Sequence, residues 1–112
     1  MLILPIKKQW FDMILTSEKK EEYREIKPYY ESRFMNAFGG SIFCGSENLH
    51  MEQVMFRNGY SKKSPSFIAD CSLHVGEGNP EWGAEINKDY FVLEIHKIVW
   101  KSSDNMGGYI NI

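Results

Sequence analysis

The chain has 112 residues and a net charge of −2, and 43% of its residues are hydrophobic and 14% aromatic. This length suits one domain spanning residues 1–112, and the apolar content excludes general disorder because it is sufficient for a core. The charge excludes a generally basic surface for duplex nucleic acid, although a local positive groove stays open.

The first third of the chain predicts alternating strands and helices. Leu2–Ile6 is apolar with an internal proline, as in a short strand near a sheet edge. From Lys8 to about Thr16 the apolar spacing predicts an amphipathic helix. The apolar stripe of this helix consists of Trp10, Phe11, Ile14 and Leu15. Glu21–Ile26 then predicts a strand that places Glu22, Arg24 and Ile26 on one face.

A second amphipathic helix is predicted over residues 29–38. Pro28 is a good start signal, and Gly39-Gly40 ends the helical pattern. The apolar face of this helix consists of Tyr30, Phe34, Ala37 and Phe38. We expect Tyr29 and Tyr30 to pack along the helix face.

The remainder of the chain is mostly strand. Ile42–Cys44 and Gln53–Phe56 are short candidates, and Asn58-Gly59 predicts a tight turn with positive φ at both residues, prolonged to Pro65. Residues 67–75 alternate with period two, which predicts a half-buried strand. Its inward face would consist of Phe67, Ala69, Cys71, Leu73 and Val75.

Turn formers dominate residues 76–89, which predict a long loop of the kind that is often functional. Tyr90–Trp100 predicts a further strand, and residues 101–112 a loosely held tail. Helices gathered early and antiparallel strands later predict an α+β fold, a small curved sheet or barrel with two flanking helices.

The cysteines and histidines give no sign of a disulfide or a metal site. Cys44 and Cys71 form no CxxC pair, and we expect free buried thiols. The three histidines lack the short spacings of zinc sites, so we expect no metal and no cofactor. They are His50, His74 and His96. No apolar run approaches the roughly 18 residues of a membrane helix, and MLILPIKKQW lacks the basic start of a secretion signal, so we expect a soluble, cytoplasmic protein without a membrane partner.

The charged stretch SEKKEEYREIKP, residues 17–28, allows two interpretations. Glu22 and Arg24 are neighbours on one strand face, and Lys19 lies at the junction with the preceding helix. A carboxylate, a guanidinium and an ammonium can therefore converge to bind a nucleobase edge or a phosphate, or to move protons. The alternative is a solvated cluster of ion pairs.

The same region resembles the start of an ASCH domain, the family named for its homology to activating signal cointegrator. The family signature G-x-K-x-x-E-x-R follows a helix reading W/Y-x-x-x-I, and here its positions are Ser17, Lys19, Glu22 and Arg24 within LPIKKQWFDMILTSEKKEEYR. The segments MFRNGYSKKSPS, WGAEI and YFVLEIHKI also resemble bacterial and phage members, so the resemblance spans residues 2 to about 100.

The resemblance implies a β-barrel similar to the PUA fold, with a cleft that accepts RNA or a nucleotide-like ligand. The signature Lys19, Glu22 and Arg24 would project into this cleft. One branch of small ASCH proteins consists of amidohydrolases acting on 4-acetylcytidine, in which the signature lysine, a threonine at the position of Glu22 and a later glutamate are catalytic.

This chain departs from that branch in two ways. Ser17 replaces the signature glycine, which is tolerable if the turn does not need a positive φ. Glu22 replaces the threonine, and a glutamate can act as a general base toward water but cannot replace an attacking hydroxyl. The candidates for the later glutamate are Glu77, Glu81 and Glu94.

Residues outside the signature also have two interpretations. Trp82 is either a lid residue that stacks on a base or a hydrophobic plug that anchors its loop. Lys62 lies in a polar hairpin tip that either contacts phosphate or is simply solvated. The other polar residues of this tip are Asn58, Tyr60 and Lys63.

Three functional hypotheses follow. The first is a binding module for RNA or a nucleotide-like ligand, with Lys19, Glu22, Arg24, Trp82 and Lys62 as ligand-binding residues. The second is a small amidohydrolase in which Lys19 and Glu22 activate water against an acylated nucleoside such as 4-acetylcytidine. The third is a protein-interaction module whose charged strand pairs with a partner.

Overall fold

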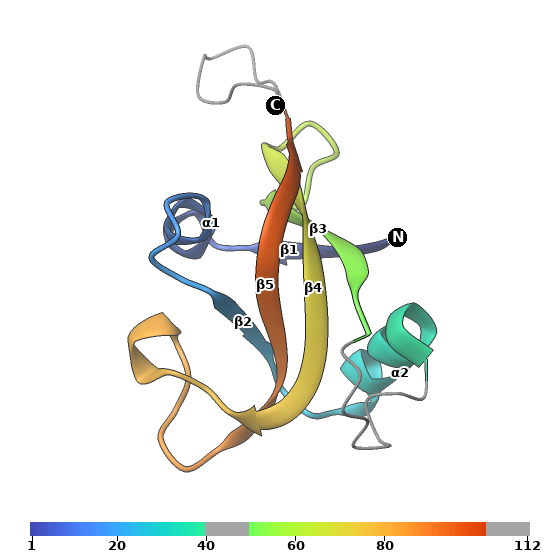
Figure 1. Ribbon diagram of the computed structural model, residues 1–112, viewed down its shortest axis with the longest axis vertical. Helices are drawn as coiled ribbons and strands as arrows, with labels where there is room; N and C mark the ends of the chain where they lie inside the picture. Colours follow the sequence, from blue (N-terminus) through green and yellow to red (C-terminus); the bar gives the residue numbers. More distant parts are fainter. Residues whose placement is uncertain (40–49, 103–112) are drawn as a thin grey trace.

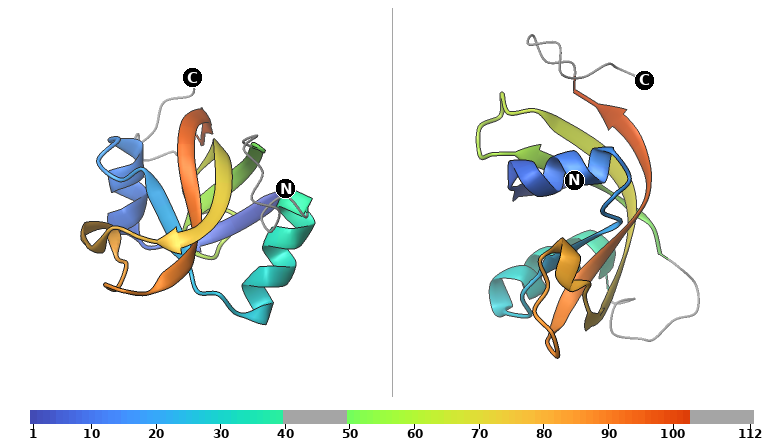
Figure 2. Two further views of the ribbon diagram at one scale, coloured as in Figure 1. Left: turned by 60° about the horizontal axis from the view of Figure 1, so that its bottom comes forward. Right: turned by 90° about the vertical axis from the view of Figure 1, so that its left-hand side faces the viewer.

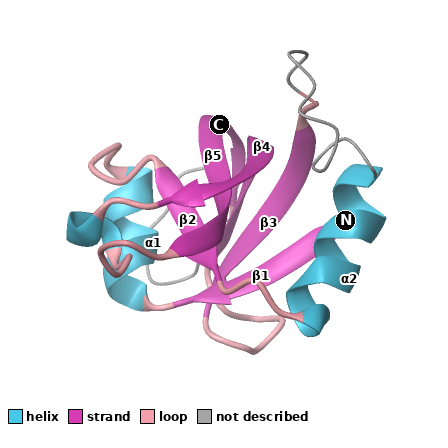
Figure 3. Cartoon of the chain, turned by 90° about the horizontal axis from the view of Figure 1, so that it is seen from below, coloured by secondary structure: helices cyan, strands magenta, loops and turns pink. Residues whose placement is uncertain are grey.

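A computed structural model describes residues 1–39 and 50–102 of the chain. Within these residues five strands form one curled sheet that is flanked by two helices (Figure 1, Figure 3). The elements in chain order are β1 (Leu2–Ile6), α1 (Lys8–Leu15), β2 (Glu21–Arg24), α2 (Pro28–Phe38), β3 (Glu52–Asn58), β4 (Ser66–Glu77), the 3-10 turn η2 (Pro80–Trp82) and β5 (Asp89–Lys101).

The sheet curls into a half-barrel and is open along one side (Figure 2). Its strand order is β1-β3-β4-β5-β2, with β1 parallel to β3 and all other pairs antiparallel. The pairing of β4 with β5 is irregular between Ile68 and Ala69 and between Asp70 and Cys71, and such irregularities bend a strand pair. The two edge strands, β1 and β2, border the open side, where the candidate site lies.

The core lies between the curled sheet and the two helices. Helix α1 contributes Phe11 and Ile14, and α2 contributes Phe34 and Phe38. The ring of Phe11 lies 5.1 Å from that of Phe67 on β4, which is the separation of favourable aromatic pairs. The predicted α+β class, both helices and the edge position of β1 are therefore confirmed.

The predicted inward face of β4 is fully buried only in its first half. Phe67, Ala69 and Cys71 are fully buried, but Leu73 is half-buried and Val75 is 42% exposed. The reason lies in the sheet, because β3 pairs with β4 only as far as Cys71 and the rest of β4 pairs with β5 alone. Val75 is paired with the buried Phe91 and so shares its face, but the predicted burial of Val75 is wrong.

Other predicted boundaries also need correction. Strand β2 ends at Arg24, and Ile26 lies beyond it, exposed to solvent. Gly59 has φ 117°, but Asn58 has a negative φ and ends β3, so the predicted tight turn is wrong. The connection instead runs to Pro65, whose carbonyl accepts the Asn58 N–H at 2.9 Å.

The end of the last strand differs from its prediction, and two predicted segments cannot be compared with the structure. Lys101 belongs to β5 and not to a loose tail. The predicted strand Ile42–Cys44 and residues 103–112 lie outside the described residues.

A smaller cluster fixes the η2 loop against the sheet. Tyr23, Ala84, Tyr90 and Val92 are buried together, and Trp82 packs against them. Gly78 is required here, because a Cβ at this position would lie 2.7 Å from both the Tyr23 ring and Ala84. The loop is thereby held beside β2, next to the open side of the half-barrel.

Candidate functional site

The charged stretch is positioned by a sharp turn at the end of α1. Ser17 has φ 68°, a left-handed conformation that favours glycine. The N–H groups of Glu18 and Lys19 both donate to the Met13 carbonyl and close the helix end. The turn therefore does need a positive φ, so the condition under which serine replaces glycine without strain is not met here.

The structure brings Lys19, Glu22 and Arg24 together as a buried triad. One Glu22 carboxylate oxygen (Oε1) lies 3.0 Å from Lys19 Nζ, and the other (Oε2) lies 2.5 Å from Arg24 Nη1. The side chains of Lys19 and Glu22 are only 1% and 6% exposed. The interpretation as a solvated ion-pair cluster is therefore wrong for these three residues.

Within the described residues, protein groups surround Lys19 and leave it 1% exposed. Its ammonium donates to the Trp82 carbonyl at 2.7 Å and lies over the rings of Trp10 and Tyr23, 4.6 and 5.0 Å from their centroids. Burial lowers the pKa of this ammonium below its usual value, and the Glu22 carboxylate acts in the opposite direction. Lys19 thus joins the η2 loop to β2 from beneath the site.

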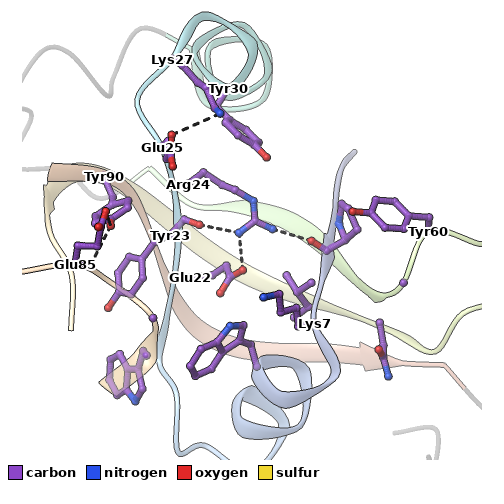
Figure 4. A pocket seen from close by; sticks show the side chains of 17 residues that line it. Lys7, Glu22, Tyr23, Arg24, Glu25, Lys27, Tyr30, Tyr60, Glu85 and Tyr90 are labelled. Atoms are coloured by element: carbon purple, nitrogen blue, oxygen red, sulfur yellow. Dashed lines mark hydrogen bonds and ion pairs between the residues drawn. The ribbon is translucent and has the colours of Figure 1, made fainter. Parts of the chain in front are cut away.

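Arg24 closes the open side of the half-barrel. Its Nη1 also donates to the Tyr23 carbonyl at 2.7 Å, and its Nη2 donates to the Pro5 carbonyl at 2.8 Å (Figure 4). Because Pro5 lies on β1 and Arg24 on β2, the guanidinium bridges the two edge strands. A guanidinium has five N–H donors, so two remain without a partner among the described residues.

A pocket of about 820 Å³ opens above Glu22 and Arg24 (Figure 4). Its charged lining is balanced, with three acidic side chains and three basic ones. These are Glu22, Glu25 and Glu85, and Lys7, Arg24 and Lys27. Its six aromatic residues are Trp10, Tyr23, Tyr30, Tyr60, Trp82 and Tyr90.

Tyr23 keeps its proton in this site. Its hydroxyl donates to Glu21 Oε1 at 2.7 Å and accepts the Asn79 N–H at 2.8 Å. Burial raises the pKa of the phenol well above its usual value. The ring therefore presents a neutral aromatic face beside the Lys19 ammonium.

The pocket includes some of the residues that the sequence singled out and leaves others outside. Glu22, Arg24 and Trp82 line it, whereas Lys19 lies behind its wall and Lys62 is exposed on the hairpin. The candidate glutamates Glu77, Glu81 and Glu94 do not line it.

Several lining residues of the pocket were not predicted from the sequence. They come from three segments of the chain and meet only in the folded half-barrel: Lys7 and Trp10 at the start of α1, Tyr30 in α2, and Glu85 after η2. Tyr30 was expected to pack, and it both packs against the core and lines the pocket, whereas Tyr29 is 59% exposed and does not fit the packing prediction.

The described residues give little indication of metal or thiol chemistry. Cys71 is a free buried thiol whose pKa burial raises to about 12; Cys44 lies outside the described residues. In residues 1–39 and 50–102 no three His, Cys, Asp or Glu side chains are placed to hold a metal ion.

No helix in the described part of the chain has the length and apolar character needed to cross a membrane.

Comparisons of the chain with models of protein families, with curated proteins and with solved structures found no match.

Proposed function

We propose that this chain is a small ASCH-like domain of PUA-like fold that binds RNA or a nucleotide-like ligand in the pocket above Glu22 and Arg24. The observation that carries the proposal is the buried triad at the base of an aromatic-lined pocket. Polar groups fixed at the base of a pocket with aromatic walls are the usual arrangement of a small-molecule site.

The base of the pocket offers both donors and acceptors to a nucleobase edge. Arg24 has two N–H donors without a partner among the described residues. Each Glu22 oxygen contacts one cation, and a carboxylate has about four acceptor positions, so about two stay available to a base amino or sugar hydroxyl group. Both side chains are held by ion pairs before a ligand arrives, which lowers the entropy lost on binding.

The walls of the pocket suit a flat ring. Trp10, Trp82 and Tyr30 are half-buried and line it from α1, η2 and α2. Stacking of a base on such a side chain contributes about 1–3 kcal/mol and tolerates any base. We therefore assign Trp82 the role of a lid residue that stacks on a base. Trp82 also packs against the smaller cluster and so anchors the η2 loop.

The enclosure of Lys19 favours binding over hydrolysis. A catalytic lysine must reach the substrate, whereas the Lys19 ammonium is committed to Glu22 Oε1 and the Trp82 carbonyl and does not line the pocket. We therefore assign Lys19 a positioning role, holding Glu22 and the η2 loop in place.

The proposal is tested by thermal shift and calorimetric titration with the common ribonucleosides, their monophosphates and 4-acetylcytidine. A ligand present at 100 times its dissociation constant stabilises the fold by about 2.7 kcal/mol. We expect Arg24→Gln to weaken binding by about tenfold or more through the loss of a charge-assisted hydrogen bond. Lys97→Gln is the matched control, because Lys97 is exposed and does not line the pocket.

Two outcomes would contradict the proposal. If no nucleoside or nucleotide binds, the proposed binding function is wrong. Turnover of 4-acetylcytidine that disappears in both Lys19→Met and Glu22→Gln would replace the binding module by the amidohydrolase.

A further inference from the structure

A second pocket of about 460 Å³ adjoins the first one on the side of α2. The two pockets share Pro5, Tyr30, Gly59 and Tyr60 as lining residues. The second pocket continues along Ile3 and Leu4 of β1, the edge strand whose outer side has no partner strand among the described residues. A ligand that enters the first pocket can therefore extend into the second without leaving the surface.

The second pocket differs from the first in charge. Its charged lining consists of Arg33 and Arg57, with no Asp or Glu. Neither arginine forms an ion pair within residues 1–39 and 50–102. Because acidic and basic groups balance in the first pocket, this pair concentrates unneutralised positive charge beside it. Paired arginines of this kind suit a phosphate, which accepts parallel hydrogen bonds from a guanidinium.

The same pocket carries aromatic rings that are open to solvent. Tyr60 is 90% exposed and Tyr29 is 59% exposed. Arg33 lies over the Tyr29 ring at 4.5 Å, and Tyr29 meets Tyr30 edge-on at 5.0 Å. Large aromatic side chains are usually buried, and exposed rings interleaved with arginines are typical of surfaces that bind single-stranded nucleic acid.

We propose that the second pocket binds the phosphate and the neighbouring base of a single-stranded RNA whose other base occupies the first pocket. This inference rests on the proposed function and specifies its ligand: the preferred ligand is an oligonucleotide of at least two residues, and a free nucleoside fills only half of the site. Arg33 and Arg57 bind the phosphate that links the two nucleosides. Tyr29 and Tyr60 supply the stacking surface for the second base.

The test compares the affinities of ribonucleosides with those of ribodinucleotides by calorimetric titration. One further stacking contact predicts that the best dinucleotide binds about tenfold or more tightly than its better nucleoside. A single phosphate contact on a single strand gives a log–log salt slope of about −0.7, and an uncharged nucleoside gives none. The double variant Arg33→Gln/Arg57→Gln should lose both the tenfold advantage and the salt slope, with nucleoside affinity unchanged.

A charge-matched control separates a local site from overall charge. Lys20→Gln/Lys97→Gln removes the same two positive charges from exposed positions that line neither pocket, and it should keep the full dinucleotide advantage. Arg33 is exposed and Arg57 half-buried, so urea unfolding of the arginine variant should show a folded protein of nearly unchanged stability.

The outcomes distinguish this inference from the proposed function. Nucleosides that bind while dinucleotides bind no more tightly overturn the inference and leave the function standing. Dinucleotide binding that is lost in the arginine variant but kept in Arg24→Gln would place the whole ligand in the second pocket, which overturns the proposed function and, with it, the inference that the ligand spans both pockets. A short polyaspartate that binds as tightly as the dinucleotide at the same salt concentration would show that the second pocket selects negative charge alone, and would overturn the inference. Absence of binding by any of these ligands would overturn both proposals.

Discussion

Replacing Lys19 by methionine tests how the buried triad holds the site together. Methionine keeps an unbranched side chain of similar length but removes the ammonium that contacts Glu22 Oε1 and the Trp82 carbonyl. Removing one partner of a buried ion pair costs about 3–5 kcal/mol. Glu22 keeps Arg24 as a partner, so we expect the lower end, about 3 kcal/mol, which includes about 1–3 kcal/mol for the buried carbonyl left without its donor.

The assay is urea unfolding followed by tryptophan fluorescence. With a typical slope of about 1–3 kcal/mol per molar urea, the midpoint should fall by about 1–3 M. The matched control is Lys20→Met, because Lys20 is the exposed neighbour of Lys19 and should change stability by less than about 0.5 kcal/mol. Equal effects of the two substitutions would refute the burial of Lys19.

The same pair of proteins has a predicted pH dependence. The pKa of Lys19 is lowered by burial from its usual 10.5, so between the lowered pKa and 10.5 the unfolded chain binds more protons than the folded one. Stability supplied through Lys19 therefore rises with pH in this window. The stability difference between wild type and Lys19→Met should grow as the pH rises toward 10.5, and a difference that shrinks would contradict the direction of this pKa shift.

Three further predictions concern single positions. Ser17→Gly should stabilise the fold by about 1 kcal/mol, because Ser17 has φ 68° and a left-handed conformation costs other residues about 1–2 kcal/mol; a loss of stability in urea unfolding would contradict the turn. Gly78→Ala should destabilise by about 1–3 kcal/mol, since its Cβ would lie 2.7 Å from the Tyr23 ring, and a neutral result would show that the η2 loop is loosely packed. Burial raises the pKa of Cys71 from 9.0 to about 12, so above about pH 9 the thiol ionises in the unfolded chain but stays protonated in the folded one. The stability of the wild type should therefore fall relative to that of Cys71→Ala by up to about 1.4 kcal/mol per pH unit above about pH 9. Parallel stability profiles of the two proteins against pH would contradict this prediction.

Much of the fold could be predicted from local patterns. The apolar stripe that includes Phe11 and Ile14 predicted α1, and Pro28 and Gly39 marked the ends of α2 within one residue. The exposure of Val75 was missed because alternation along a strand does not reveal where its neighbours stop pairing. The conformation of Ser17 was missed for a related reason, since the sequence carries serine where the backbone favours glycine.

The candidate site was predictable only where its residues are close in sequence. Lys19, Glu22 and Arg24 lie within six positions, and strand geometry was sufficient to bring the last two together. The contacts of Lys19 with Trp82 and of Arg24 with Pro5 join segments far apart in the chain, and no local pattern indicates them. For that reason the sequence placed Lys19 in the ligand cleft, whereas its ammonium contacts the Trp82 carbonyl and does not line the pocket.

The most direct test of the central claim uses the indole N–H signals of the three tryptophans in nuclear magnetic resonance spectra of nitrogen-labelled protein. Trp10 and Trp82 line the pocket above Glu22 and Arg24, and Trp100 near the end of β5 does not. Titration with ribonucleosides, and then with the best dinucleotide, should shift the signals of Trp10 and Trp82 in a saturable way and leave that of Trp100 unchanged. Binding that shifts Trp100 alone, or that leaves Trp10 and Trp82 unmoved at saturation, would contradict a nucleobase site in this pocket.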